Sequence, residues 1–196
     1  MKILSKLEFR KIKSKEFDDA TQILDNELGK KRVRSSKFLY QKFKEFPKFF
    51  LGIFLDNELI GVIFGFPRED YLLMSELAID RRFQRRGFGK LLVKEFEKVA
   101  KENKYYKINV GSEDKSIYFY KSLLGYKPFL LIQFEKWDYS EEDFNKFKII
   151  RIYNYNKNNT AIEVKITNCN LKLINQLRKK YSKAYFQYIF TKRIRR

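Results

Sequence analysis

The 196-residue chain contains no histidine, one cysteine, three prolines and eight glycines. The absence of histidine excludes His-based catalytic triads, the usual zinc sites and the commonest general base. The single cysteine, Cys169, cannot form a disulfide within the chain. No apolar run approaches the roughly 18 residues of a membrane-spanning helix, and the first residues carry too many charges for a signal peptide. We therefore expect a cytoplasmic protein without a metal site.

Hydrophobic residues make up 44% of the chain, enough to bury the core of one domain, or of one domain with a small addition. The formal charge of +19 is unevenly distributed. Residues 145–196 contain fourteen Lys and Arg and a single acid, Glu163, whereas residues 1–144 contain 29 basic and 23 acidic residues. This imbalance indicates that the last quarter of the chain has a different task from the rest.

The spacing of apolar residues predicts an alternation of strands and helices. Strands are expected at 6–13, 48–66 (a hairpin turning at 56–57), 71–80, 105–111, 127–137 and 147–155. Helices are expected at 16–28, 36–47, 88–100 and 112–126. A last strand, helix and strand are expected at 158–168, 170–181 and 184–194. The helix at 112–126 is expected to have its N-cap at Ser112 or Asp114 and to stop at Gly125.

The stretch QRRGFGKLL (84–92) places Gly87 and Gly89 at the expected start of an amphipathic helix. The first amides of a helix have no intrahelical acceptor, so they point outward and attract anions. Glycine lets a phosphate approach the backbone closely. Three cations accompany the glycines: Arg85, Arg86 and Lys90. The stretch therefore predicts an anion site; a tight turn with a solvated basic rim is the alternative.

Gln84 to Gly89 also fits the Q/R-x-x-G-x-G/A signature of the GNAT family of N-acetyltransferases, and it follows LAID (77–80) as the family's acetyl-CoA strand precedes that loop. Residues 117–129 (IYFYKSLLGYKPF) resemble the second hallmark of the family, a helix with an aromatic-Tyr pair that ends at a Gly-aromatic step. The segment FQRRGFGKLL (83–92) is most similar to the ribosomal-protein-alanine (N-terminal) acetyltransferases.

The resemblance covers about residues 6–155 and implies the GNAT fold, an α+β fold in which a twisted, mostly antiparallel mixed sheet is flanked by helices. We expect a GNAT N-acetyltransferase domain over 1–156 and a small basic β-α-β extension over 157–196.

The resemblance further implies acetyl-CoA as co-substrate, without a metal, and direct attack of an amine on the thioester. The loop expected to hold the pyrophosphate consists of Gln84, Arg85, Arg86, Gly87, Phe88, Gly89 and Lys90. The pantetheine arm is expected to pair with the backbone of Leu77, Ala78 and Ile79, where an N–H polarises the thioester carbonyl, a contribution of roughly 3 kcal/mol. Tyr120 matches the tyrosine that protonates the leaving thiolate. Packing of the Tyr120 ring in the core is the alternative.

The general base of the N-terminal acetyltransferases has no direct match in this sequence. Asn109 stands where N-terminal acetyltransferases have a glutamate, and Glu113 stands in place of the family's asparagine before the last core helix. Glu76 is the one carboxylate within the apolar run of the strand at 71–80, so it is the candidate base, acting through water. A salt-bridged or edge-exposed role for Glu76 is the alternative.

The expected acceptor is a protein or peptide amine, on a ribosomal or nucleic-acid-associated partner. A small-molecule amine is an alternative, favoured by four acids in the first helix: Asp18, Asp19, Asp25 and Glu27. A second alternative is a CoA-binding module whose basic C-terminus contacts RNA, since basic residues there alternate with Tyr185, Tyr188 and Phe190. A lysine-rich composition would also explain this charge. Both monomer and homodimer remain open. Cys169 is far in sequence from the CoA motif, so no covalent enzyme intermediate is expected.

Overall fold

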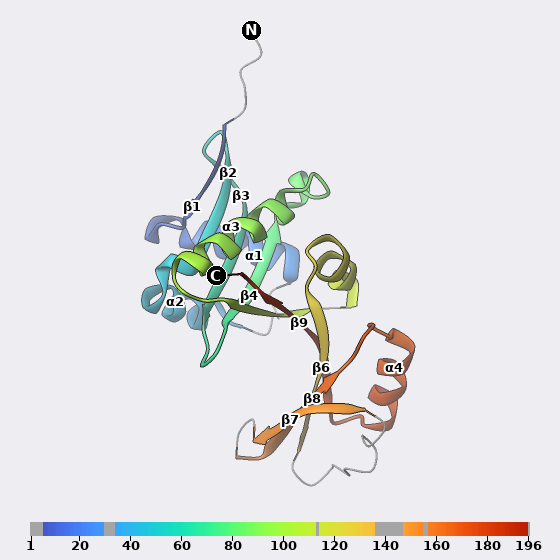
Figure 1. The fold of residues 1–196 in the computed structure, drawn as a ribbon. Helices are drawn as coiled ribbons and strands as arrows, with labels where there is room; N and C mark the ends of the chain where they lie inside the picture. Colours follow the sequence, from blue (N-terminus) through green and yellow to red (C-terminus); the bar gives the residue numbers. More distant parts are fainter. Residues whose placement is uncertain (1–5, 30–33, 113, 136–146, 155–156, 196) are drawn as a thin grey trace. The chain divides into compact units, whose positions relative to one another are not determined.

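The computed structural model describes residues 6–29, 34–112, 114–135, 147–154 and 157–195 (Figure 1). Contacts along the chain divide it into two compact units, residues 1–108 with 193–196, and residues 109–192. The expected boundary between a GNAT domain and an extension falls at residue 156, outside the described residues, and stays a prediction. No helix among the described residues is long and apolar enough to cross a membrane.

The first unit contains an antiparallel run of strands in the order β1-β2-β3-β4. Their bounds are Leu7–Lys11, Phe50–Leu55, Glu58–Pro67 and Leu72–Ile79. The β2–β3 hairpin turns at Asp56 and Asn57, whose φ angles of 49° and 70° are left-handed, as the sequence predicts for this pair. Because nearly all residues of β2 and β3 are buried, both faces of these strands are covered.

Helices cover the two faces of this sheet. They are α1 (Phe17–Leu28), α2 (Ser36–Glu45) and α3 (Phe88–Glu102). On β3 the Phe64 ring lies 6.1 Å from the α1 ring of Phe17, whereas a Cβ on the next residue, Gly65, would lie 2.5 Å from the Phe96 ring of α3. Successive strand residues point to opposite faces, so α1 and α3 pack on opposite sides. Gly65 allows the close approach of α3.

The second unit is built on an antiparallel sheet in which β9, β6, β8 and β7 are neighbours in that order. The bounds are Lys127–Glu135 for β6, Lys148–Asn154 for β7, Asn159–Lys165 for β8, Leu171–Lys180 for α4 and Tyr185–Arg193 for β9. Strand β5 (Lys107–Ser112) begins in the first unit and ends in the second. The expected strand, helix and strand near the C-terminus are therefore present as β8, α4 and β9.

The pairing of β6 gives these last elements an unexpected place. Gln133 of β6 pairs with Tyr185 of β9, although 51 residues separate them in the chain. A short hairpin is enough to join two neighbouring antiparallel strands. Here β7, β8 and α4 lie along the chain between the paired strands β6 and β9. In the strand order β9 lies between β5 and β6, so the last strand is an inner strand of the sheet and not an appendage at its edge.

The helix expected at 112–126 differs from the prediction. Ser112 belongs to β5 and Asp114 is the first residue of the helical turns, so neither is the predicted N-cap. A 3₁₀ turn (Asp114–Ser116) leads into a π-helical turn (Phe119–Leu123), and the Tyr126 amide donates to the Tyr120 carbonyl at 3.0 Å. Gly125, with φ of 71°, ends the segment as expected. Further 3₁₀ turns occur at Ser14–Glu16, Pro47–Phe49 and Arg81–Phe83.

An ion pair next to β1 makes stability dependent on pH. Both Glu16 carboxylate oxygens accept from the Arg10 guanidinium at 2.8 Å, and this hydrogen bonding lowers the pKa of Glu16 from 4.5 to about 2. A depressed pKa stabilises the fold above the unfolded-state pKa, and this stabilisation is lost as the pH falls from 4.5 towards 2.

We therefore expect Glu16→Gln to reduce the free energy of unfolding at pH 7 by about 2 kcal/mol. The difference from the wild type should shrink as the pH falls below 4.5, measured by urea unfolding at a series of pH values. Glu69→Gln, at an exposed acid, is the matched control and should change little. A difference that is constant from pH 7 to pH 3 would contradict this role for the Arg10–Glu16 pair.

Candidate functional site

Strand β4 carries a bulge just before the expected pantetheine residues. Phe64 pairs with Glu76 and Gly65 with Met74, which leaves Ser75 as an extra residue. A bulge increases the local twist and changes the direction of nearby side chains. Beyond it, the backbone of Leu77, Ala78 and Ile79 pairs with β3, and the strand ends at the loop that leads to α3.

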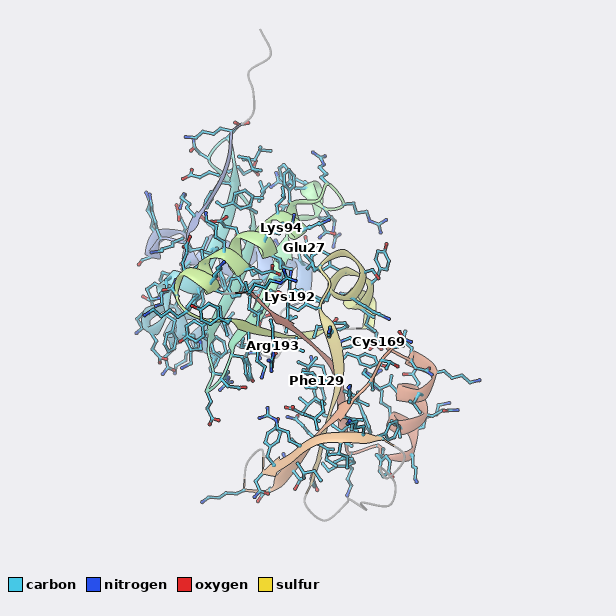
Figure 2. All side chains as sticks on the ribbon, in the orientation of Figure 1. Glu27, Lys94, Phe129, Cys169, Lys192 and Arg193 are labelled. Atoms are coloured by element: carbon cyan, nitrogen blue, oxygen red, sulfur yellow. The ribbon has the colours of Figure 1, made fainter. Side chains whose placement is uncertain are left out.

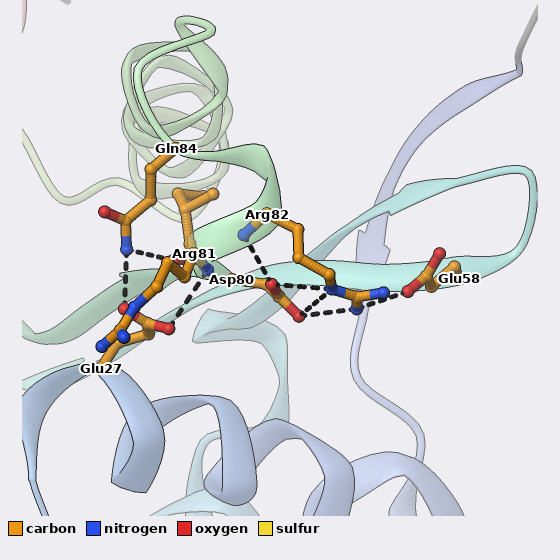
Figure 3. A network of polar contacts seen from close by, with 7 residues as sticks. Glu27, Glu58, Asp80, Arg81, Arg82 and Gln84 are labelled. Atoms are coloured by element: carbon orange, nitrogen blue, oxygen red, sulfur yellow. Dashed lines mark hydrogen bonds and ion pairs between the residues drawn. The ribbon is translucent and has the colours of Figure 1, made fainter.

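The loop after β4 is held on one side by an ion-pair network (Figure 3). Asp80 accepts hydrogen bonds from the Arg82 amide at 2.9 Å and from the Arg82 guanidinium at 2.7 Å, and these bonds lower the pKa of Asp80 below its ordinary value. The same guanidinium donates to Glu58 at 2.6 Å. The charge of Arg82 is therefore already compensated.

Gln84, the first residue of the expected signature, forms hydrogen bonds to other parts of the protein through its side chain. Its Nε2 donates to Glu27 at 2.7 Å and to the Ile79 carbonyl at 2.8 Å. The other Glu27 oxygen accepts from the Arg81 amide at 3.1 Å. Glu27 thus contacts the loop 54 and 57 residues further along the chain, a link that no local pattern in the sequence could reveal.

The start of α3 leaves its first amides available. Gly87 is the N-cap, with φ of 86° and no side chain to cap the helix, and its carbonyl accepts from the Leu91 amide. The amides of Phe88, Gly89 and Lys90 precede the first i→i−4 bond, so they have no intrahelical acceptor. A helix start of this kind, preceded by left-handed residues, favours an anion.

Three cations surround this helix start: Arg85, Arg86 and Lys90, all exposed. Within the described part of the chain, none of them forms an ion pair with a carboxylate, in contrast to Arg82. Arg85 is left-handed, with φ of 61°, which costs a residue with a side chain roughly 1–2 kcal/mol. Strained backbone of this kind is concentrated at functional sites. Uncompensated cations and open amides together fit a group with several negative charges, such as a pyrophosphate.

Glu76, the candidate base, is 8% exposed and lies directly after the bulge. Its Oε1 lies 3.4 Å from the Arg34 guanidinium and accepts from the Ser75 hydroxyl at 3.3 Å. Both readings of the sequence therefore have a structural basis: a buried carboxylate next to the expected thioester strand, and an ion-paired residue. Its catalytic role stays a prediction.

Tyr120 belongs to the second unit, whereas Glu76 belongs to the first. The Tyr120 side chain is 6% exposed, and its ring lies 5.1 to 6.1 Å from the rings of Phe119, Tyr126 and Phe190. The ring is therefore packed in the core, while the π-helical turn that carries it is a feature often found at functional sites. Its role as a proton donor stays a prediction.

The sequence departs from the family pattern at Asn109 and Glu113. Asn109 of β5 is 5% exposed, and its Oδ1 is buried without a hydrogen-bond partner among the described residues. Buried polar atoms normally have partners, so this oxygen is available to a donor that the protein does not supply. Glu113 lies outside the described residues.

The features that favoured the alternative functions are arranged differently from what each would need. Tyr188 and Phe190 are 3% and 0% exposed, so they belong to the core and cannot stack on bases, whereas Tyr185 is 47% exposed. The acids of α1 lie in its first turn (Asp18, Asp19) and its last (Asp25, Glu27), so they do not form one cluster. Among the described residues, no group of three His, Cys, Asp or Glu is placed to hold a metal ion.

Comparison with known proteins finds the same family that the sequence resembles. Residues 10–126, more than half of the chain, match the model of the acetyltransferase (GNAT) family. No curated protein sequence matches the chain.

Similar solved structures include Ard1 from Thermoplasma volcanium, with a TM-score of 0.54 and 16% identity over 82% of this chain and 98% of that one. The diaminobutyrate acetyltransferase EctA from Paenibacillus lautus, in complex with diaminobutyric acid and coenzyme A, has a TM-score of 0.54 and 11% identity over 86% of this chain and 99% of that one. A GNAT acetyltransferase from Elizabethkingia anophelis with acetyl-CoA bound has a TM-score of 0.53 and 15% identity over 96% of this chain and 98% of that one. Likeness at these identities shows a shared fold.

Proposed function

The chain belongs to the GNAT family of acetyltransferases, and from this premise we propose that its acceptor is the primary amine of a protein, either an N-terminus or a lysine side chain. Its activity is that of an N-acetyltransferase with acetyl-CoA as co-substrate. The observation that carries the proposed site is the start of α3, where open amides lie among Arg85, Arg86 and Lys90. These groups would hold the pyrophosphate.

The charge of the protein supports a protein acceptor. A formal charge of +19 repels small cationic amines and attracts acidic macromolecules. Among proteins of the same fold, EctA was solved with a small amine, diaminobutyric acid. The similarity of FQRRGFGKLL to N-terminal acetyltransferases instead favours a protein amine. A small-molecule amine is the second candidate acceptor.

Each chemical step has a candidate residue. Acetyl-CoA supplies the acyl thioester. The backbone of Leu77 to Ile79 would align the pantetheine arm and direct an N–H at the thioester oxygen, which stabilises the charge that develops there. Glu76 would accept the amine proton through water, the amine nitrogen would bond to the acyl carbon as the C–S bond breaks, and Tyr120 would donate a proton to the departing sulfur.

Cys169 supports direct transfer over an acyl-enzyme. Partial burial raises the pKa of its thiol, so it stays protonated and is a poor nucleophile. It lies between β8 and α4, in the second unit (Figure 2).

The decisive test is calorimetric titration of acetyl-CoA into the protein, followed by detection of free thiol with a panel of peptides and small amines. We expect binding, and thiol release with peptides. Release with small amines alone would replace the proposed acceptor by a small molecule. Binding without release on any amine, together with salt-sensitive RNA binding, would favour a CoA-binding module. Absence of binding would overturn the pyrophosphate site.

A further inference from the structure

We propose that Glu27 is a positioning residue for the proposed phosphate-binding loop: from the end of α1 it holds residues 81–84 so that the first amides of α3 are kept in the arrangement that binds a pyrophosphate. This inference rests on the proposed function. It concerns a residue that makes no contact with CoA in the proposal and acts through Gln84 and the backbone of Arg81.

The contacts engage both ends of the turn (Figure 3). One Glu27 oxygen accepts from the Arg81 amide at 3.1 Å, and the other accepts from Gln84 Nε2 at 2.7 Å. Gln84 Nε2 in turn donates to the carbonyl of Ile79, the last residue of β4, at 2.8 Å. One carboxylate therefore ties α1, the end of β4 and the turn before α3 into a single hydrogen-bonded group.

The residues that follow Gln84 need this support. Arg85 and Gly87 are both left-handed, with φ of 61° and 86°. Glycine adopts this conformation without cost, whereas at Arg85 it persists because the surrounding structure holds it. On the C-terminal side α3 provides a rigid end, and on the N-terminal side the Gln84 side chain is held by its hydrogen bonds to Glu27 and to the Ile79 carbonyl.

The sign of the electrostatic effect makes the proposal testable. Glu27 carries a negative charge into a loop proposed to bind an anion, so by charge alone its removal should tighten CoA binding. If Glu27 acts by positioning, its removal should weaken binding instead. The two explanations predict opposite changes in the same measurement.

We expect Glu27→Ala to raise the Kd for CoA roughly tenfold, with kcat at saturating acetyl-CoA retained and KM for acetyl-CoA raised. Glu102→Ala, which removes an exposed acid at the other end of α3, is the charge-matched control and should leave Kd unchanged. Thermal unfolding of the variants identifies any loss of fold, and Glu27→Gln, which keeps the size and one acceptor oxygen, should give an intermediate Kd.

A double-mutant cycle tests the route of the effect. If Glu27 acts through Gln84, the combination of Glu27→Ala with Gln84→Ala should bind CoA about as well as the weaker single variant. Glu58→Ala, which removes a contact of Arg82, should combine additively with Gln84→Ala.

Equal or tighter CoA binding by Glu27→Ala, with normal binding by the wild type, would overturn the positioning role and leave the proposed function intact. Additive effects of Glu27→Ala and Gln84→Ala would also overturn it. A wild-type protein that does not bind CoA would overturn the proposed function itself.

Discussion

Gly87→Glu is expected to abolish CoA binding in calorimetric titration, with a loss of at least roughly 100-fold in affinity. The added carboxylate would stand at the first amides of α3, where the proposed site holds a pyrophosphate, and would compensate the positive end of the helix and the nearby cations. The fold should survive, because no heavy atom of the described residues, apart from Gly87 itself and its two chain neighbours, lies within 4 Å of the position of the new Cβ. The left-handed φ of 86° should cost roughly 1–2 kcal/mol of stability.

Two further variants separate charge from backbone strain. Gly87→Gln has the size and strain of the glutamate variant without its charge, so it should bind CoA more tightly than Gly87→Glu. Gly87→Asn places a residue that tolerates a left-handed backbone at the same position, so it should be the most stable of the three. Normal CoA affinity in Gly87→Glu would remove the pyrophosphate from this helix start.

Tyr120→Phe is expected to lower kcat by roughly 100-fold, the lower end of the effect of a lost general acid, with little change in CoA affinity. The substitution removes the hydroxyl alone, so the ring contacts with Phe119, Tyr126 and Phe190 should remain. Thiol release at saturating acetyl-CoA measures the rate, and calorimetry measures the affinity.

Tyr126→Phe is the matched control, since this tyrosine is 2% exposed and its ring lies 6.1 Å from that of Tyr120. It loses the same atom from the same aromatic cluster, and its rate should stay near that of the wild type. Equal loss in both variants would mean that the cluster needs its hydroxyls for packing. An unchanged rate in Tyr120→Phe would assign Tyr120 to the core alone.

Local patterns predicted the elements of the first unit because these patterns act within a few residues. The alternation in β1, the stop of α2 before Pro47 and the turn at Asp56 and Asn57 all depend on near neighbours. The segment around Tyr120 was harder to predict, because over one turn the spacing of apolar residues in a π-helix differs little from that in an α-helix. Neither N-cap candidate was correct, since Ser112 extends β5 and Asp114 is already the first residue of the helical turns.

The sequence by itself determined the family and the helix start that we propose as the phosphate site, because the two glycines and three cations lie within six residues and act through the local backbone. Only the tertiary structure showed that Arg82 is compensated by Asp80 and Glu58, and that Glu27 holds the loop through Gln84. The pairing of β9 with β6 was decided in the same way. Apart from the Asp80–Arg82 contact, these features join residues at least 24 positions apart. Such contacts depend on how the elements pack, which no periodicity within one element records.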